Sequence, residues 1–377
     1  MKSLSTLLRA LQKSSYLESS TNAQNSVINF NLLNNGERFK TQLIENWRKT
    51  KNIRIPNEYY VENELYTYDD SRTSFINSDE FRDNIKHIRT NTLTRCPAII
   101  KSKRTISINS TNVEKTNTDI LLVSNRLGST QIIFDYFFNC ETGLENFYNI
   151  ERERKIWWMR NSANPSRYFL ESYDLNSTSN SIDGIAKSQS TTVKTRFSFG
   201  NASLETITLV PLSEVPLKHA NDFYFKSQHA GHKILPAVVR SVINVETATA
   251  VLLLDGCDNE RINTLLLNRK LVPYQCIIAC LHNVDIANDL RDLCRHLKHV
   301  LERVGLRLSD NVILTNCTEK FNNEIQNADS LGIPYAILIN ENSLNTGLLK
   351  IRSRDTTLNE TIHISEIAQY LLQIVRS

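Results

Sequence analysis

Apolar positions recur most regularly in the last hundred residues of the chain. Between residues 285 and 304 they fall at three- and four-residue intervals, as on one helix face, and Gly305 follows where a left-handed C-cap residue belongs. Alternation of such periods with short β-branched runs predicts strands at 274–281, 306–314, 334–340 and 348–353, and helices at 285–304, 319–330 and 364–375. This order, β-α-β-α-β-β-α, predicts a small α/β domain with a largely parallel sheet over residues 270–377.

The pattern between residues 25 and 265 is mixed. Phe39, Leu43 and Trp47 lie four residues apart on one face of a helix predicted at 36–48. The remaining signals predict a helix at 78–88, strands at 119–123 and 131–138, a loop at 171–192 and two apolar runs within 238–255. We therefore predict an α+β domain over residues 25–265, an antiparallel sheet with helices around it and a short polar insertion at 57–118.

The first twenty residues combine an apolar helical face with basic charge. No acidic residue occurs before Glu18, and serine is frequent. The apolar and basic positions are Leu4, Leu7, Leu8, Leu11, Lys2, Arg9 and Lys13. An amphipathic, basic, serine-rich and acid-poor segment is typical of a mitochondrial transit peptide, which we predict at 1–20. The alternative is an ordinary N-terminal helix that caps the fold.

Composition excludes several classes of protein. The chain has 377 residues, 40% hydrophobic and 22% charged, which is a globular balance long enough for two or three domains. No apolar run approaches the roughly 18 residues of a membrane helix. Seven cysteines without a CxxC pair, and histidine pairs without a third ligand at typical spacing, predict neither a disulfide scaffold nor a metal site. The net charge of +4 permits nucleic acid as a partner without requiring it.

Three C-terminal segments resemble the anticodon-binding domain of class II aminoacyl-tRNA synthetases of the glycyl, prolyl and threonyl type. They are LVPYQCIIAC (271–280), ADSLGIPYAILIN (328–340) and LNTGLLKIRSRDTTLNETIHISEIAQYLL (344–372). The run RSRDTT, followed by HIS and a final helix, more specifically resembles the accessory subunits of mitochondrial DNA polymerase gamma, a family built on the synthetase plan. Upstream segments occur in that family's order: ERERKIWWMRNSANPSRYF (151–169), FSFGNASLETITL (197–209) and KILPAVVRSVINVETATAVLLLDG (233–256).

The groups that a synthetase needs for its chemistry are missing from these segments. Class II enzymes hold ATP with two arginines, one of them in a glycine-rich strand-to-helix turn. The matching stretch here, SVINVETATAVLLL (241–254), has no glycine and carries alanine or threonine where the arginine should be. The resemblance therefore implies a degenerate, non-catalytic synthetase-like domain, with no catalytic residues and no cofactor.

Two groups of residues are candidates for binding. Cations spaced along a surface can neutralise phosphates, so we predict a nucleic-acid contact at the basic residues around the double tryptophan. These residues are Arg152, Arg154, Lys155, Arg160 and Arg167. The alternative is that the tryptophans belong to the core and the charges form a solvated rim. The resemblance also implies that the C-terminal domain docks on the catalytic chain, and we expect Arg352, Arg354, Asp355 and Thr356 to lie on or support that docking surface.

The family resemblance implies a processivity-enhancing accessory subunit in the mitochondrial matrix and nucleoid. Its partners would be the catalytic subunit of the polymerase and double-stranded or primed DNA, with no membrane partner. A second contact makes re-engagement of DNA nearly intramolecular, so dissociation per nucleotide falls. Vertebrate members dimerise through a long helical hairpin, whereas the insertion at 57–118 is short; we predict one copy per catalytic subunit, with a homodimer as the alternative. A divergent mitochondrial class II synthetase and a free-standing tRNA-binding protein remain as alternative functions.

Overall fold

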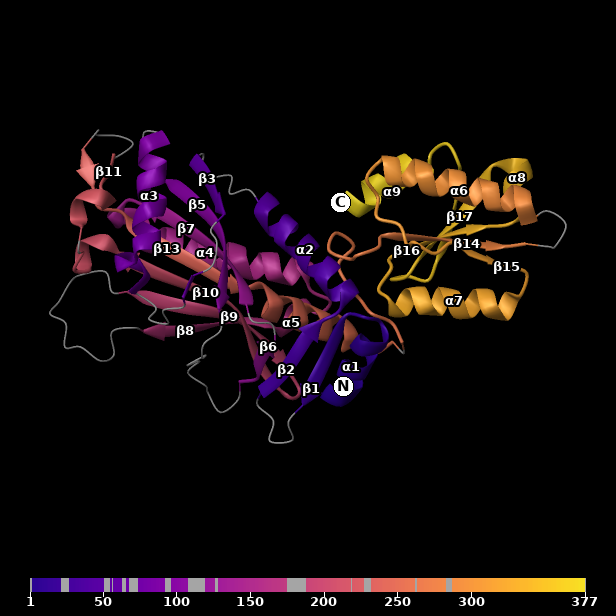
Figure 1. The fold of residues 1–377 in the computed structure, drawn as a ribbon, viewed down its shortest axis with the longest axis horizontal. Helices are drawn as coiled ribbons and strands as arrows, with labels where there is room; N and C mark the ends of the chain where they lie inside the picture. The colour runs from indigo at the N-terminus through magenta and orange to yellow at the C-terminus, as the bar shows by residue number, and fades with distance from the viewer. Residues whose placement is uncertain are drawn as a thin grey trace.

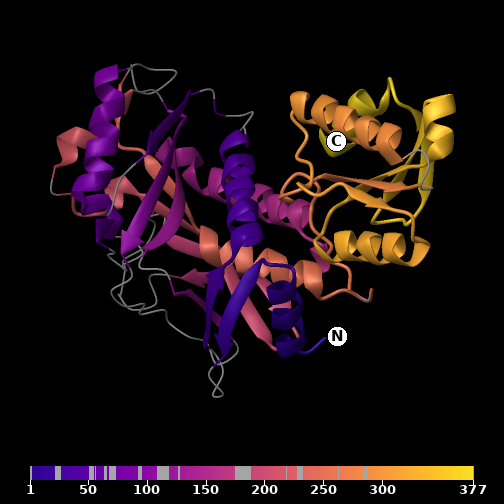
Figure 2. The same cartoon turned by 45° about the vertical axis from the view of Figure 1, so that its right-hand side comes forward.

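Two units lie side by side along the longest axis of the molecule (Figure 1). The structure is a computed structural model, and it describes residues 2–21, 27–50, 55, 57–62, 66–67, 74–91, 96–107, 119–125, 128–174, 188–217, 219–226, 232–261, 263–282 and 287–376. The larger unit contains the elements up to α5, the smaller one those from β14 onwards, and an extended segment connects them (Figures 1 and 2).

An eight-stranded sheet is the centre of the larger unit. Its order is β3-β5-β7-β13-β10-β9-β8, with β4 beside β5, and all neighbours are antiparallel except that β3 and β4 run parallel to β5. Successive side chains of a strand point to opposite faces, so this sheet has two faces to cover. The strands are β3 (Asn57–Glu62), β4 (Tyr66–Thr67), β5 (Ala98–Ser107), β7 (Gly128–Phe138), β8 (Tyr168–Asp174), β9 (Gln189–Phe197), β10 (Gly200–Pro211) and β13 (Ala237–Asn244).

Four helices and a small sheet cover one face and enclose the main core. Trp47 and Trp158 are fully buried there, and the ring of Trp47 packs against both Phe134 of β7 and Trp158. The helices are α1 (Leu4–Lys13), α2 (Asn34–Lys49), α4 (Cys140–Asn161) and α5 (Val245–Cys257), and the small sheet is β1 (Leu17–Thr21), β2 (Val27–Leu32) and β6 (Leu121–Ser124). Helix α5 carries apolar residues on every side, as expected of a helix that is almost entirely buried.

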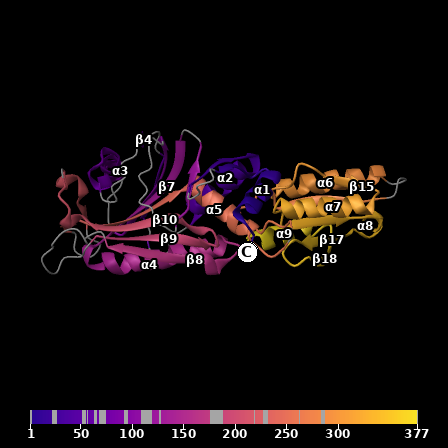
Figure 3. The same cartoon turned by 90° about the horizontal axis from the view of Figure 1, so that it is seen from below.

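A second apolar cluster covers part of the opposite face. Phe81 and Ile85 of α3 (Asp79–Asn91) pack there with Phe137 of β7 and Phe223. Helices α3 and α4 accordingly lie on opposite sides of the sheet (Figure 3). Short elements complete this cover: the 3₁₀ turns η1 (Ser74–Asn77), η3 (Leu212–Glu214) and η4 (Ala220–Phe223), and the hairpin of β11 (Phe225–Lys226) and β12 (Lys233–Ile234).

The smaller unit is a five-stranded mixed sheet with helices on both faces. Its order is β15-β14-β16-β17-β18; β14 runs parallel to β15 and β16, and the last two pairings are antiparallel. Helices α6 and α9 cover one face and α7 the other (Figures 1 and 3). The elements are β14 (Cys276–Leu281), α6 (Ala287–Arg303), β15 (Ile313–Thr315), α7 (Thr318–Ser330), β16 (Tyr335–Ile339), α8 (Glu341–Thr346), β17 (Leu348–Ser353), β18 (Asn359–His363) and α9 (Ile367–Arg376).

Most of the predicted C-terminal elements are found, with four corrections. The sheet is mixed, with two parallel and two antiparallel pairings, and not largely parallel as predicted. The predicted order lacks α8 and β18, which are too short and polar for a periodic signal. The strand predicted at 306–314 is wrong over most of its length: Leu308 forms only an isolated bridge to Cys276, and the strand proper begins at Ile313. Gly305 has the expected left-handed backbone, with φ of 88°. The first residues of the helix predicted at 285–304 lie outside the described residues.

In the larger unit, the helix predicted at 36–48 is α2, the helix at 78–88 is α3, and the strands at 119–123 and 131–138 are β6 and β7. The loop predicted at 171–192 is wrong at both ends: β8 continues to Asp174, and β9 begins at Gln189 because its serines and threonines pair with β10. Residues 175–187 lie outside the described residues. Helix α4 was not predicted, because buried polar residues interrupt its apolar face: Glu151, Arg154 and Asn161.

Candidate partner- and nucleic-acid-binding surfaces

The run RSRDTT forms the end of β17 and a tight turn into β18. The turn closes through hydrogen bonds from the Thr357 amide to the Ser353 carbonyl (2.8 Å) and from the Ser353 amide to the Leu358 carbonyl (3.0 Å), with Thr357 at a φ of 61°. Leu358 is 68% exposed, more than any other large apolar side chain among the described residues. An exposed leucine on a fixed turn is suited to insertion into a partner's pocket.

Arg354 lies beneath this turn and is 3% exposed. Its guanidinium donates to the carbonyls of Leu265 (3.1 Å), Gly332 (2.6 Å) and Leu267 (3.0 Å), and to the Asp355 carboxylate (2.9 and 2.7 Å). Two of these carbonyls belong to the segment that connects the units. Arg354 therefore joins the turn to that segment, and its guanidinium is not on the molecular surface.

The other three predicted docking residues lie around Arg354. Arg352 forms a bidentate pair with Asp329 of α7, with both distances 2.8 Å, and its side chain is 17% exposed. The Asp355 side chain is 60% exposed, and Thr356 is exposed. The structure thus brings the four predicted residues together, with two arginines supporting and two residues facing solvent. The sequence reasoning missed Leu358, although an apolar residue in the polar run DTTLNE was a usable signal.

The five basic residues around the double tryptophan divide into two sets. Arg154 is buried: its Nε donates to Glu205 (2.9 Å), and its guanidinium lies 3.3 Å from the ring centroid of Trp47. Glu205 also accepts from Trp158 Nε1 (2.5 Å) and Ser241 Oγ (2.5 Å). A buried carboxylate requires such donors, so Arg154 is a core residue that binds Glu205.

Arg167 is also engaged within the molecule. It pairs with Asp258 (2.8 Å) and lies 3.3 Å from Asp255 at the end of α5. Burial raises the pKa of the Asp255 carboxyl, although the amides of Asn164 and Ala163 donate to its Oδ2 and act against this shift. The ion pairs of Arg167 with Asp255 and Asp258 hold the turn after α4 against the end of α5.

Arg152, Lys155 and Arg160 remain at the surface of α4. Arg152 and Arg160 are exposed and Lys155 is half-buried. Glu153 is the exposed acidic residue among them, whereas Glu141 and Glu145 lie further toward the start of the helix. The second half of α4 therefore presents a net positive surface, which the buried Arg154 and the ion-paired Arg167 do not extend.

The sheet face that carries α3 contains a further arginine that is already occupied. Arg240 of β13 forms a bidentate pair with Asp135 of β7, with both distances 2.7 Å. Its guanidinium lies 3.6 Å from the ring centroid of Phe75, and Phe81 covers it further. Strand β13 leads into the 241–254 stretch. The arginine of this strand is therefore neutralised by Asp135 and covered by Phe75 and Phe81.

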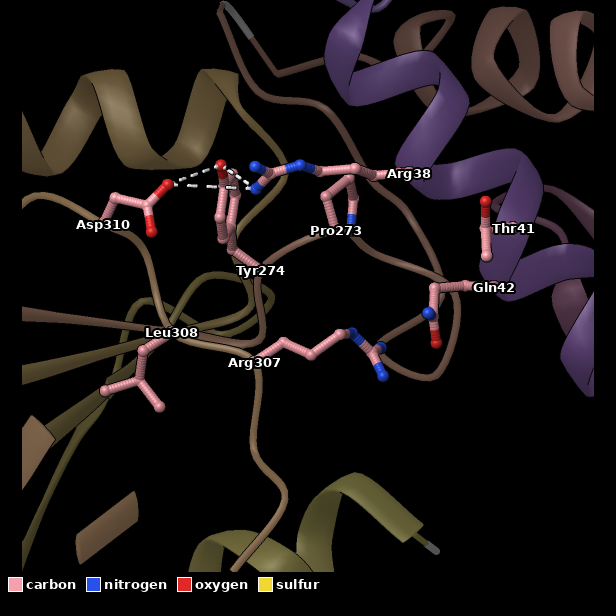
Figure 4. A pocket seen from close by; sticks show the side chains of 8 residues that line it. All are labelled: Arg38, Thr41, Gln42, Pro273, Tyr274, Arg307, Leu308 and Asp310. Atoms are coloured by element: carbon pink, nitrogen blue, oxygen red, sulfur yellow. Dashed lines mark hydrogen bonds and ion pairs between the residues drawn. The ribbon is translucent and has the colours of Figure 1, made fainter. Parts of the chain in front are cut away.

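A polar cavity of about 280 Å³ lies between α2 and the smaller unit. Figure 4 shows Arg38 reaching from α2 to the hydroxyl of Tyr274, which in turn contacts Asp310. Arg307 lines the same cavity and donates to the carbonyls of Lys270 (2.9 Å) and Val272 (3.1 Å), which fixes the connecting segment. These contacts join the two units.

Neither a metal-ligand cluster nor a membrane-spanning helix is found within the described ranges. No group of three histidine, cysteine, aspartate or glutamate side chains there is arranged to hold a metal ion. In the same residues, no helix combines the length and the apolar character needed to cross a membrane.

Comparison with known proteins gives consistent matches. Residues 275–374 match the family described as "Anticodon binding domain". The chain is 37% identical over 352 residues to "DNA polymerase subunit gamma-2, mitochondrial" of Drosophila melanogaster, covering 92% of this chain and 93% of that one. It is 23% identical to the Xenopus laevis protein of the same name, over 59% of this chain and 48% of that one. It is 22% identical to "Glycine--tRNA ligase" of Chlorobaculum tepidum, over 64% and 50%.

Proposed function

The chain belongs to the DNA polymerase subunit gamma-2 family, and from this premise we infer that it is an accessory subunit of the mitochondrial DNA polymerase. The observation that carries this conclusion is 37% identity over 92% of the chain, which includes both units. Its location is mitochondrial, and its partner is the catalytic subunit. We place it in the matrix, at the nucleoid where that polymerase acts.

The protein acts without an active site of its own. The stretch that matches the ATP-binding turn of synthetases is β13 followed by α5, and α5 is buried. Arg240, just before this stretch, forms an ion pair with Asp135 and is covered by the ring of Phe75. ATP–pyrophosphate exchange with any amino acid above background would contradict this part of the proposal.

We assign the docking surface for the catalytic subunit to the β17–β18 turn. Asp355, Thr356 and Leu358 face solvent there, while Arg354 and Arg352 hold the turn from below. A rigid turn loses little conformational entropy on binding, so its exposed groups contribute more of their contact energy to affinity. Leu358 is the expected anchor, because it is the most exposed large apolar side chain among the described residues and docking would bury the most apolar surface there.

A substitution at Leu358 tests this assignment against a matched leucine. Leu358→Ser should weaken binding of the catalytic subunit about tenfold or more, measured by surface plasmon resonance or sedimentation. Leu348→Ser at the opposite end of β17 is the control. Leu348 is also exposed (46%), so this variant likewise replaces an exposed leucine by serine. Equal affinity for Leu358→Ser and the unaltered chain, or equal weakening by both variants, would contradict the assignment.

For the DNA contact we propose the second half of α4. Each phosphate neutralised by a lysine or arginine releases counterions and steepens the salt dependence of binding, by about 0.9 in the log–log slope. Arg152, Lys155 and Arg160 are the cations available there. The triple substitution to glutamine should reduce that slope by about 2 to 3 for primed duplex DNA bound by the holoenzyme.

The control for this measurement lies on another helix. Arg291, Arg295 and Arg303 are exposed on α6, so their substitution by glutamine removes the same charge from the smaller unit. An unchanged slope for the α4 variant, or an equal fall in both, would refute a specific contact at α4.

We propose one copy of this chain per catalytic subunit. Within 57–118, the described residues contain one α-helix, α3, and its apolar side packs on the sheet through Phe81 and Ile85. That helix is part of a core, and its buried face is not available for pairing with a second copy. Sedimentation equilibrium of the holoenzyme should give a 1:1 mass, and a 1:2 mass would refute this stoichiometry.

A further inference from the structure

Helix α1, within the segment predicted to be a transit peptide, is part of the main core. Leu7 and Leu11 are 0% exposed and Leu8 is 6% exposed, and they belong to the same apolar cluster as α5. Ser3 caps the helix start by accepting from the Thr6 amide. The leucine stripe that indicates a targeting helix in the sequence is therefore buried in the folded molecule.

The residues around α1 also hold the junction between the units. Tyr16 is 1% exposed, and its hydroxyl donates to the Leu331 carbonyl of the smaller unit (2.9 Å). A Cβ on Gly36 would lie 2.1 Å from the Tyr16 carbonyl oxygen, so α2 is fitted closely against this residue. Lys2 Nζ donates to the carbonyl of Cys257 (2.9 Å), the last residue of α5, and to that of Arg261 (3.1 Å) beyond it.

The two basic residues of α1 lie on a different side of the helix from its buried leucines. Arg9 and Lys13 are exposed on the outer side of α1. Before folding, the leucines and the two cations form the amphipathic, basic helix that is typical of import signals. After folding, the leucines are buried while the cations still face water. The leucines therefore serve both import and folding, whereas Arg9 and Lys13 are needed for import alone.

We propose that α1 is an import signal that is retained: it directs the unfolded chain into mitochondria and then becomes a permanent part of the core. A signal that a matrix protease removes must be dispensable for the fold, whereas residues 2–16 supply leucines to the main core and the Tyr16 contact with the smaller unit. This inference rests on the mitochondrial location and not on the polymerase role, so primer extension by recombinant holoenzyme can succeed or fail independently of it.

The state of the N-terminus after import is the first test. The full chain with a C-terminal tag is expressed in eukaryotic cells, purified from their mitochondria and analysed by intact-mass and N-terminal peptide mass spectrometry. The expected chain retains residues 2–16, and a mature N-terminus beyond Leu7 would overturn the proposal.

A deletion tests the structural half of the proposal, namely that α1 is a permanent part of the core. Residues 2–16 are removed, and the shortened and full chains are each placed behind the same unrelated, cleavable mitochondrial leader. Loss of several buried leucines should lower the melting temperature by about 10 °C or more, or leave the shortened chain insoluble. A shortened chain that is soluble and melts within about 2 °C of the full chain would overturn the structural half.

A charge reversal tests the targeting half without disturbing the core. Arg9→Glu with Lys13→Glu should prevent import of the otherwise unaltered chain, while the melting temperature of the recombinant protein stays within about 2 °C. The matched control is Arg291→Glu with Arg295→Glu on the exposed side of α6, which should be imported normally. Normal import of the α1 variant would overturn the targeting half.

Discussion

Replacing Arg354 with alanine should loosen the smaller unit from the segment that connects it to the larger one. The substitution removes three hydrogen bonds from a charged donor to the carbonyls of Leu265, Gly332 and Leu267. Bonds to charged groups contribute about 1.5 to 3 kcal/mol each, and the carbonyls left behind are buried. Because contributions of neighbouring bonds are not additive, we expect a loss of about 3 to 5 kcal/mol in the free energy of unfolding, below the simple sum.

The assay must report on the smaller unit by itself. All three tryptophans of the chain lie in the larger unit, so their fluorescence follows that unit alone. Hydrogen–deuterium exchange read at residues 265–267 and 332–339, with chemical denaturation followed by circular dichroism, measures the predicted change. The expected result is faster exchange in both segments, with little change in the tryptophan environment.

Two substitutions on β17, the strand that ends just before Arg354, serve as controls. Lys350→Ala removes an exposed cation and should leave the stability within about 0.5 kcal/mol. Arg352→Ala removes one bidentate pair with Asp329 near the surface, which should cost about 1 kcal/mol. An Arg354→Ala protein as stable as the Lys350→Ala protein, with unchanged exchange, would refute the reasoning.

Three further perturbations test the packing of the larger unit. Burial raises the pKa of Glu151, so ionising this carboxyl destabilises the native state as the pH rises from about 4; the melting temperature of Glu151→Gln relative to the unaltered chain should therefore increase between pH 4 and pH 7, and a constant difference would contradict this. Gly36→Ala should cost about 2 kcal/mol or more in chemical denaturation because its Cβ would meet the Tyr16 carbonyl, whereas Gly305→Ala, with open space around it, should cost about 1 kcal/mol; equal costs would contradict the steric argument. Glu205→Ala leaves buried donors without an acceptor and should cost about 3 to 5 kcal/mol, and a loss below 1 kcal/mol would contradict the burial argument.

The sequence predicts the smaller unit well because its elements have strong local signals. The leucine period of α6 and the left-handed Gly305 after it are properties of adjacent residues. Helix α4 escaped prediction for the opposite reason: Glu151 and Arg154 are polar by type but buried by their tertiary partners. A helical period read from residue types cannot show that Arg154 is buried, because its partner, Glu205, is 51 positions away in the sequence.

The candidate site shows the same limit. The position of Arg354 in the RSRDTT run was found from the sequence, but its burial was not. Its carbonyl partners Leu265, Leu267 and Gly332 lie 89, 87 and 22 positions away, and backbone carbonyls carry no residue-type signal. Leu358 was passed over because one apolar residue in a polar turn has no period, although its exposure makes it the expected anchor.

Processivity of the cognate catalytic subunit, measured with and without this chain, tests the central claim most directly. Primer extension under single-binding conditions is followed across a series of salt concentrations, because phosphate contacts weaken as salt rises. The account predicts longer products per binding event with the chain present, surviving to higher salt, and a loss of this effect in the Leu358→Ser protein. Product lengths unchanged by the chain, under conditions where the catalytic subunit alone is active, would contradict it.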